Sequence, residues 1–246
     1  MFQYHCLNPI AGVGLANFNE NYQQTESLEG ADAVLVRSAA MHGMELPKSL
    51  LAVARAGAGV NNIPLADCAE QGIVVFNTPG ANANGVKELV LAGMLLASRD
   101  IAGGIEWVKS DKEDGDIAKT AEKQKKKFAG CEISGKKLGI IGLGAIGRRV
   151  AQIARAFGAN VIYYSASGRP AQDGYTQVDF NTLLTTSDII SVHAPLNEHT
   201  ENLLDKCAFA KMKETCIFLN LGRGPIVVEQ DLYDALVNGE IAAAGL

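Results

Sequence analysis

The sequence predicts an α/β protein in which parallel strands alternate with helices on both faces of a doubly wound sheet. Two observations support this class. Short, continuous apolar runs recur along the chain, and most of its 26 glycines fall at the ends of those runs. Continuous apolar runs are typical of parallel strands buried on both faces, and glycine at their ends permits tight turns into the helices. With 48% hydrophobic residues among 246, the chain can build one or two domains.

The first ninety residues show three such runs, each followed by a polar residue at the start of a loop. Strands and helices at this spacing imply right-handed crossovers and a smaller, flavodoxin-like parallel sheet. Ligands of such sheets bind beyond the carboxyl ends of the strands, where Arg37, Arg55 and Asn77 fall. The strands are expected at 33–36, 51–54 and 73–76.

A long helix is expected at 84–99, followed by a polar and charged stretch at 106–130 with Trp107 as its large apolar anchor. This composition indicates an exposed helical connection between two lobes. We therefore expect domains at 1–98 and 99–246.

The second domain repeats the alternation of strands and helices on a larger scale. One helix carries apolar Val150, Ile153, Ala154 and Phe157 on a single face, as an amphipathic helix packed on a sheet does. The expected strands are 138–141, 161–164, 188–192, 216–220 and 241–246, and the expected helices are 148–157 and 232–237.

Charge and cysteine content exclude several classes of function. The net charge of −5 makes nucleic acid a poor partner, and the basic run at 123–127 lies close to acidic residues at 111–116, which indicates a solvated helix face. The five cysteines are scattered, which favours neither disulfides nor a zinc site. The sequence shows no signal peptide and no run long enough to cross a membrane, so we expect a cytoplasmic protein with no membrane or metal partner.

Residues 142–147 read Gly-Leu-Gly-Ala-Ile-Gly, which fits the G-x-G-x-x-G pattern. The pattern is weak alone, but here it follows a predicted strand and opens a predicted amphipathic helix, which is the context that gives it meaning. Gly142 and Gly144 let the backbone turn and approach a pyrophosphate, and Gly147 lets helix and strand pack closely. The free N–H groups of the helix start bind the phosphates. The sequence therefore predicts a Rossmann-type dinucleotide-binding domain.

The position that distinguishes NAD from NADP departs from the usual pattern. An acidic residue is expected about twenty residues after the glycines, where it binds the ribose hydroxyls. This sequence has Ser165 there, which does not repel a 2′-phosphate, and Arg169 four residues later has the charge to bind one. NAD is the expected cofactor, and NADP remains the alternative.

Further motifs form an ordered series over nearly the whole chain. They are RAGAGVNN at 55–62, FNTPGAN at 76–82, KEL at 87–89, FAG at 128–130, SGK at 134–136, VHAPL at 192–196 with Thr200, and LNLGRG at 219–224 with Val227. Together with the glycine loop, this series resembles the D-2-hydroxyacid dehydrogenase family, and within it the members that act on 3-phosphoglycerate.

The resemblance implies roles for individual residues. Arg223 matches the family's catalytic arginine, which binds the substrate carboxylate and carbonyl oxygen, a task that suits the planar fork of a guanidinium. Ala58 and Gly59 match the loop that binds the carboxylate through backbone N–H groups. Arg37 and Arg55 match phosphate contacts, although either could instead bridge the lobes. Ala58 also lies near the cofactor in relatives. The other implied cofactor contacts are Ala145 and Ile146 at the pyrophosphate, Ala194 on the adenosine side, and Leu221 and Gly222 at the nicotinamide.

Hydride transfer at an alcohol carbon also needs a base, for which histidine is best suited at neutral pH. None of His5, His42, His193 and His199 matches that role, and His193 lies in the adenosine-side motif. In relatives the base is a histidine with a glutamate partner beyond the position of Leu246. We therefore expect that the C-terminal part of the family fold is missing and that these 246 residues alone have negligible turnover.

The resemblance implies an NAD-dependent oxidoreductase, with 1–98 as the substrate-binding domain and 99–246 as the dinucleotide-binding domain. The expected reaction is oxidation of 3-phospho-D-glycerate to 3-phosphohydroxypyruvate, which opens serine biosynthesis. Reduction of glyoxylate, hydroxypyruvate or another D-2-hydroxyacid is the alternative within the class, and a non-catalytic NAD(H)-sensing protein is the alternative outside it. Relatives also imply a homo-oligomer, such as a dimer joined through the 84–99 helix and Trp107.

Overall fold

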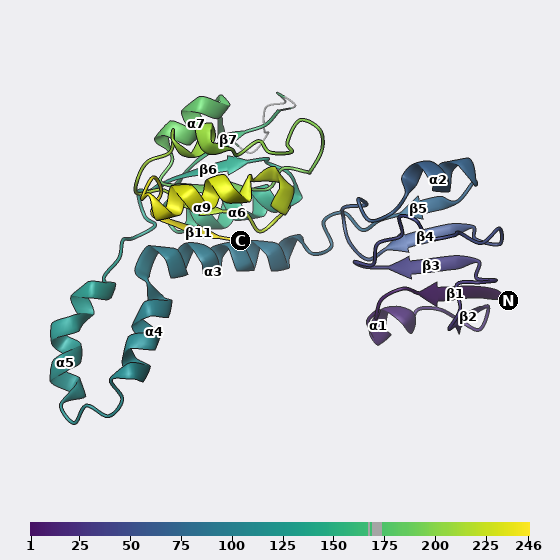
Figure 1. Ribbon diagram of the computed structural model, residues 1–246, viewed down its shortest axis with the longest axis horizontal. Helices are drawn as coiled ribbons and strands as arrows, with labels where there is room; N and C mark the ends of the chain where they lie inside the picture. The colour runs from purple at the N-terminus through teal and green to yellow at the C-terminus, as the bar shows by residue number, and fades with distance from the viewer. Residues whose placement is uncertain (167, 169–173) are drawn as a thin grey trace. The chain divides into compact units, whose positions relative to one another are not determined.

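The structure is a computed structural model that describes residues 1–166, 168 and 174–246. The chain divides into two compact units, Met1–Asn82 and Ala83–Leu246 (Figure 1). Each unit is built on its own parallel sheet, so the predicted α/β class is confirmed. Among the described residues, no helix combines the length and the apolar character that crossing a membrane requires.

The first unit contains a five-stranded parallel sheet in the order β2-β1-β3-β4-β5. This is the flavodoxin-like order, as the sequence predicted. Val34, Val36 and Val53 are fully buried in its core, which explains why these short apolar runs form the central strands. The elements are β1 (Phe2–Cys6), α1 (Gly12–Leu15), β2 (Tyr22–Thr25), β3 (Ala33–Val36), β4 (Ala52–Arg55), α2 (Leu65–Glu70) and β5 (Val74–Phe76).

The second unit contains a six-stranded parallel sheet in the order β11-β10-β9-β6-β7-β8. Numbered within the unit, this is the Rossmann order, with β6 and β9 at the centre. The strands and helices are α3 (Ala83–Arg99), α4 (Ile101–Ser110), α5 (Ile117–Gln124), β6 (Lys137–Ile141), α6 (Ala145–Ala156), β7 (Asn160–Tyr164), β8 (Thr176–Gln177), α7 (Phe180–Thr186), β9 (Ile189–Val192), α8 (Lys206–Phe209), β10 (Ile217–Leu219), α9 (Glu229–Val237) and β11 (Ala243–Gly245), with 3₁₀ turns η1 (Lys125–Phe128) and η2 (Gly224–Ile226).

Helices cover both faces of this sheet. On one face α3 and α6 pack against alternate strand residues such as Leu138 and Ile140, and on the other α7, α8 and α9 pack against residues such as Ile190 and Phe218. Two buried layers of this kind require strands that are apolar on both sides, which is the pattern that the sequence shows.

The expected domain boundary at 98/99 differs from the division of the structure, which falls after Asn82. The reason is the position of α3. Val90 and Met94 of this helix are fully buried in the same core as Leu138 and Val150, so the helix belongs to the second unit.

The stretch at 106–130 is also placed differently from the expectation. Instead of joining two lobes, α4, α5 and η1 lie within the second unit, between α3 and β6, and form an arm that projects from its body (Figure 1). Trp107 packs on Phe128 with ring centroids 5.9 Å apart, which ties the two sides of the arm together.

Candidate dinucleotide and substrate sites

The glycine loop lies between β6 and α6, as predicted, and each glycine has a distinct steric environment. Gly142 has a φ of +95°, and a Cβ built there would lie 2.8 Å from the backbone nitrogen of Ala194. A Cβ on Gly147 would lie 2.3 Å from the carbonyl oxygen of Gly142. A Cβ on Gly144 would meet no atom within 4 Å. Gly142 and Gly147 are therefore required by packing, whereas the space beside Gly144 is open to a ligand.

Backbone N–H groups converge on that open space. Gly144 is the N-cap of α6, and the N–H of Arg148 is the first to bond back to its carbonyl oxygen, at 3.0 Å. The N–H groups of Ala145, Ile146 and Gly147 come earlier in the helix and have no intrahelical acceptor. These unbonded N–H groups and the positive end of the helix dipole make the start of this 12-residue helix a suitable binding site for an anionic diphosphate.

Three strand ends lie beside the loop. Ile141 pairs with Tyr164 of β7 and with Val192 of β9, so Gly142, Ser165 and His193 follow neighbouring strands at the same carboxyl edge. Ser165, which is half-buried, stands where a ribose-binding carboxylate is usual. Arg169, the candidate for a 2′-phosphate, lies outside the described residues.

His193 is held in a neutral form by burial. Its Nε2 lies 2.9 Å from the Ser191 hydroxyl, and its Nδ1 is buried without a hydrogen-bond partner. Burial lowers the pKa of His193 to about 4, because the charged imidazolium would lose its hydration. An imidazole with this pKa is a poor proton acceptor at neutral pH.

The turn after β10 carries the predicted nicotinamide and catalytic residues. Asn220, which is 5% exposed, accepts a hydrogen bond from the Gly222 N–H at 3.3 Å and donates one to the Arg223 carbonyl at 3.0 Å. Its side chain thus fixes the backbone from Leu221 to Arg223. Sequence reasoning missed this role, because an asparagine in a glycine-rich turn gives no sign of which backbone groups it binds.

A cavity of about 370 Å³ opens beside this turn, lined by Leu221, Gly222 and Leu89 among others. The Arg223 side chain is half-buried, and among the described residues it forms no ion pair. A cation at a strand end with no carboxylate partner in the described part of the chain is suited to an anionic ligand.

In the first unit, the predicted substrate residues follow β3 and β4. Arg55 donates through Nε to the Arg37 carbonyl at 3.0 Å and through Nη1 to the Gly59 carbonyl. Asn77 donates to the Ala58 carbonyl at 2.7 Å. The Arg55 guanidinium therefore supports the loop that holds Ala58 and Gly59, in addition to any ligand contact, whereas the Arg37 side chain is exposed.

Asn8 is a second residue that sequence reasoning missed. Its Oδ1 accepts hydrogen bonds from the backbone N–H groups of Arg37, Ser38 and Ala39 at 2.9, 2.9 and 3.0 Å. One amide oxygen after β1 therefore shapes the loop that carries Arg37. Within the described ranges, no group of His, Cys, Asp and Glu side chains is placed to hold a metal ion.

The Rossmann strand order, the glycine turn and the helix start define the second unit as a dinucleotide-binding domain. Residues 91–246 match the family model described as D-isomer specific 2-hydroxyacid dehydrogenase, NAD binding domain. The chain belongs to this family, and its cofactor class is therefore NAD(P), for which the open space at Gly144 and the start of α6 provide a fitting site.

Curated relatives differ in their named substrates. The chain is 39% identical to a hydroxypyruvate reductase of Thermotoga maritima over 87% of this chain and 68% of the relative. It is 40% identical to a D-3-phosphoglycerate dehydrogenase of Archaeoglobus fulgidus over 87% of this chain and 40% of the relative, so it spans less than half of that protein. The structure of a glyoxylate reductase from Paecilomyes thermophila superposes with a TM-score of 0.82 at 26% identity, covering 100% of this chain and 80% of the other.

Proposed function

We propose that the protein is an NAD-dependent dehydrogenase that oxidises 3-phospho-D-glycerate to 3-phosphohydroxypyruvate, the step that opens serine biosynthesis. The observation that carries the proposal is Arg223, a half-buried cation in the turn after β10, between Gly222 and Gly224, which line the cavity, and without an ion-pair partner among the described residues. Its guanidinium would bind the substrate carboxylate and polarise the carbonyl oxygen. The 40% identity to a D-3-phosphoglycerate dehydrogenase supports the choice of substrate.

The first unit would contribute the remaining contacts to the acid. Backbone N–H groups of Ala58 and Gly59 would bind the carboxylate, and Arg37, whose side chain is exposed, would bind the phosphate. Arg55 would act mainly by holding the loop at Gly59 through its hydrogen bond to that carbonyl.

For the cofactor, we assign the diphosphate to the loop Gly142–Gly147, with the N–H groups of Ala145 and Ile146 as donors. Ser165 would bind the ribose, Ala194 would lie by the adenosine, and Leu221 and Gly222 would line the nicotinamide, which when bound accepts the hydride. NAD is proposed over NADP on the description of the matched domain as NAD binding.

A reductase of unphosphorylated acids is the second candidate. The hydroxypyruvate reductase at 39% identity favours it, and Ser165 would favour NADPH, because a hydroxyl does not repel the 2′-phosphate that a carboxylate would exclude.

We also propose a homodimer in a reducing compartment. All five cysteines are free thiols, and α4 exposes Ile101, Ile105 and Val108 on one side.

The test compares kcat/KM of the full-length gene product for 3-phosphoglycerate with NAD or NADP, and for hydroxypyruvate and glyoxylate with NADH or NADPH. We expect the phosphorylated acid and NAD to be preferred. Arg37→Gln should remove the preference for the phosphorylated acid, while the matched surface change Arg149→Gln should not. A higher kcat/KM for unphosphorylated acids would favour the reductase. Tight NADH binding without turnover or binding of any acid would favour a dinucleotide sensor.

A further inference from the structure

The second unit has another pocket, at the opposite end from the glycine loop. It has a volume of about 260 Å³ and is lined by residues from the end of α3, the turn before β6 and the end of α6. The glycine loop follows the carboxyl end of β6, whereas Ile133 and Ser134 of this pocket precede the amino end of the same strand. The pocket is therefore separate from the dinucleotide site.

One of the residues that line this pocket has an unsatisfied polar group. Ser98 is 5% exposed, and its Oγ is buried without a hydrogen-bond partner. A buried hydroxyl without a hydrogen-bond partner has lost its bonds to water without replacing them, so Ser98 destabilises the ligand-free protein. Because solvent does not reach the Oγ, the Ser98 side chain would have to rotate about χ1 to meet a polar group of a bound ligand and recover this cost.

Two opposite charges line the pocket without neutralising each other. Arg99 donates one long hydrogen bond, at 3.4 Å, to the Ala129 carbonyl, and within the part of the chain that the structure describes it forms no ion pair. Glu132 also lines the pocket, and no ion pair joins it to Arg99, so their charged atoms are more than 4.0 Å apart. Both charges are thus available to one ligand that lies between them.

The helix termini add a further preference. Both α3 and α6 end at this pocket, and the C-terminus of a helix carries a partial negative charge that favours a cation. An ammonium group is therefore favoured near Glu132 and the end of α6, and the Arg99 guanidinium at the end of α3 favours a carboxylate. Leu95, Ile133 and Phe157, the last of which is 45% exposed, offer an apolar surface beside these groups.

We infer that this pocket binds a small zwitterion with an apolar side chain, that is, an α-amino acid of moderate size. The carboxylate pairs with Arg99, the ammonium pairs with Glu132, and one of the two bonds the Ser98 hydroxyl once that side chain has rotated towards the ligand. The volume lies just below the range of pockets for drug-sized molecules, which suits a ligand of this size. The inference depends on neither the proposed substrate nor the proposed cofactor.

Cys131 makes the pocket directly testable. Its thiol is exposed and lines the pocket, and its backbone N–H bonds the Ser98 carbonyl at 2.8 Å. Cys207, in α8 on the other face of the sheet, is also exposed and serves as an internal control. The rates at which iodoacetamide alkylates the two thiols are measured by mass spectrometry in the presence of L-leucine, 4-methylpentanoate or 3-methylbutylamine.

Leucine at about ten times its dissociation constant should slow alkylation of Cys131 about tenfold and leave Cys207 unchanged. Each analogue lacks one charge and should protect much less at the same concentration. Arg99→Gln and Glu132→Gln should abolish protection, whereas Glu106→Gln on α4 should retain it. Ser98→Ala should weaken protection while keeping the protein at least as stable.

Three results would overturn the inference. Cys131 could react at an unchanged rate at millimolar leucine, or the two analogues could protect it as well as leucine does. In the third, the alkylation of Cys131 without ligand would become slower as the protein concentration rises. That would mean that a second copy of the chain covers the pocket.

Discussion

Gly142 lies against Ala194 so closely that a Cβ on the glycine would be 2.8 Å from the backbone nitrogen of the alanine. This contact joins the glycine loop after β6 to the segment after β9. The position of the loop is therefore set by the strand beside it, before any dinucleotide is bound.

Gly142→Ala should destabilise the second unit and abolish NADH binding. The substituted residue would retain a φ of +95° and would clash with backbone that cannot yield easily. Strain and overpacking of this kind cost about 1–3 kcal/mol each. Urea denaturation and NADH fluorescence titration measure the two effects.

Gly144→Ala is the matched control for the fold. Its Cβ would meet no atom within 4 Å, so the free energy of unfolding should change by no more than about 1 kcal/mol, from the weaker N-cap. NADH affinity should still fall, because the methyl group occupies the space assigned to the diphosphate. Unchanged NADH affinity in this variant would contradict the assignment.

His193 should make the protein sensitive to mild acid. Its folded pKa of about 4 is lower than the ordinary value of 6.5, so the unfolded chain binds the proton more readily. The stabilisation is fully present above pH 6.5 and is lost as the pH falls towards 4, with an upper bound of about 3 kcal/mol.

Urea denaturation at several pH values, compared between the wild type and His193→Asn, isolates this term. The difference in unfolding free energy between the two proteins should shrink as the pH falls from 6.5 to 4. If the His193 imidazole titrates near pH 6.5 by NMR, the ring is hydrated, and His193 would again be a candidate for the catalytic base.

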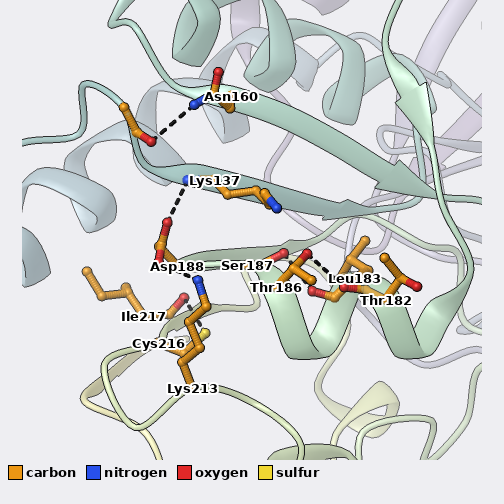
Figure 2. A network of polar contacts seen from close by, with 11 residues as sticks. Lys137, Asn160, Thr182, Leu183, Thr186, Ser187, Asp188, Lys213, Cys216 and Ile217 are labelled. Carbon is orange, nitrogen blue, oxygen red and sulfur yellow. Dashed lines mark hydrogen bonds and ion pairs between the residues drawn. The ribbon is translucent and has the colours of Figure 1, made fainter.

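Asp188 should be a stability residue at the amino end of the second sheet. Its carboxylate accepts the Lys137 N–H at 2.7 Å and pairs with the Lys213 ammonium at 2.8 Å (Figure 2). Burial alone would raise the pKa of Asp188, but these bonds to the charged form lower it overall. Stability from this group is therefore present above pH 3.8 and is lost as the pH falls through its lower folded value.

Asp188→Asn should cost about 1.5–3 kcal/mol, the value of hydrogen bonds to a charged group. Lys213→Met should cost less, about 1 kcal/mol at most, because the Lys213 side chain is 38% exposed and the Lys137 N–H still binds the carboxylate. Equal losses in the two variants, measured by urea denaturation at pH 7, would mean that the ion pair rather than the backbone contact dominates.

The α4 surface should control self-association. Ile101, Ile105 and Val108 are 41%, 50% and 54% exposed and lie at the spacing of one helix face. Ile105→Asp would place a charge in the proposed dimer contact and should yield a monomer in sedimentation velocity, while Lys112→Gln should not. A wild-type protein that is monomeric at micromolar concentration would refute the dimer.

Sequence patterns predicted the features that depend on local chemistry. The glycine loop, the apolar strands and the long helix at α3 are visible because each follows from residue types at short spacing. The expected boundary at 98/99 differs from the division after Asn82, because the burial of α3 at Val90 depends on strands that come later in the chain.

The hydrogen-bond partners of side chains were harder to predict from the sequence than the helices and strands. The phosphate contact that the resemblance implies for Arg55 stays a prediction, and nothing in the sequence indicated that its guanidinium also bonds the carbonyls of Arg37 and Gly59. Asn8 and Asn220 were not predicted at all, since an asparagine can bind many backbone groups and only the folded loop selects which.

The strand order of the second sheet has a consequence for how the chain is made. The central strand β6 pairs with β9, about fifty residues later, and β10 and β11 extend the sheet only after that. Parallel pairings of such long sequence separation form slowly. The described strands of the first sheet all come before Asn82, so on the ribosome they can pair while the later strands of the second sheet are still being synthesised.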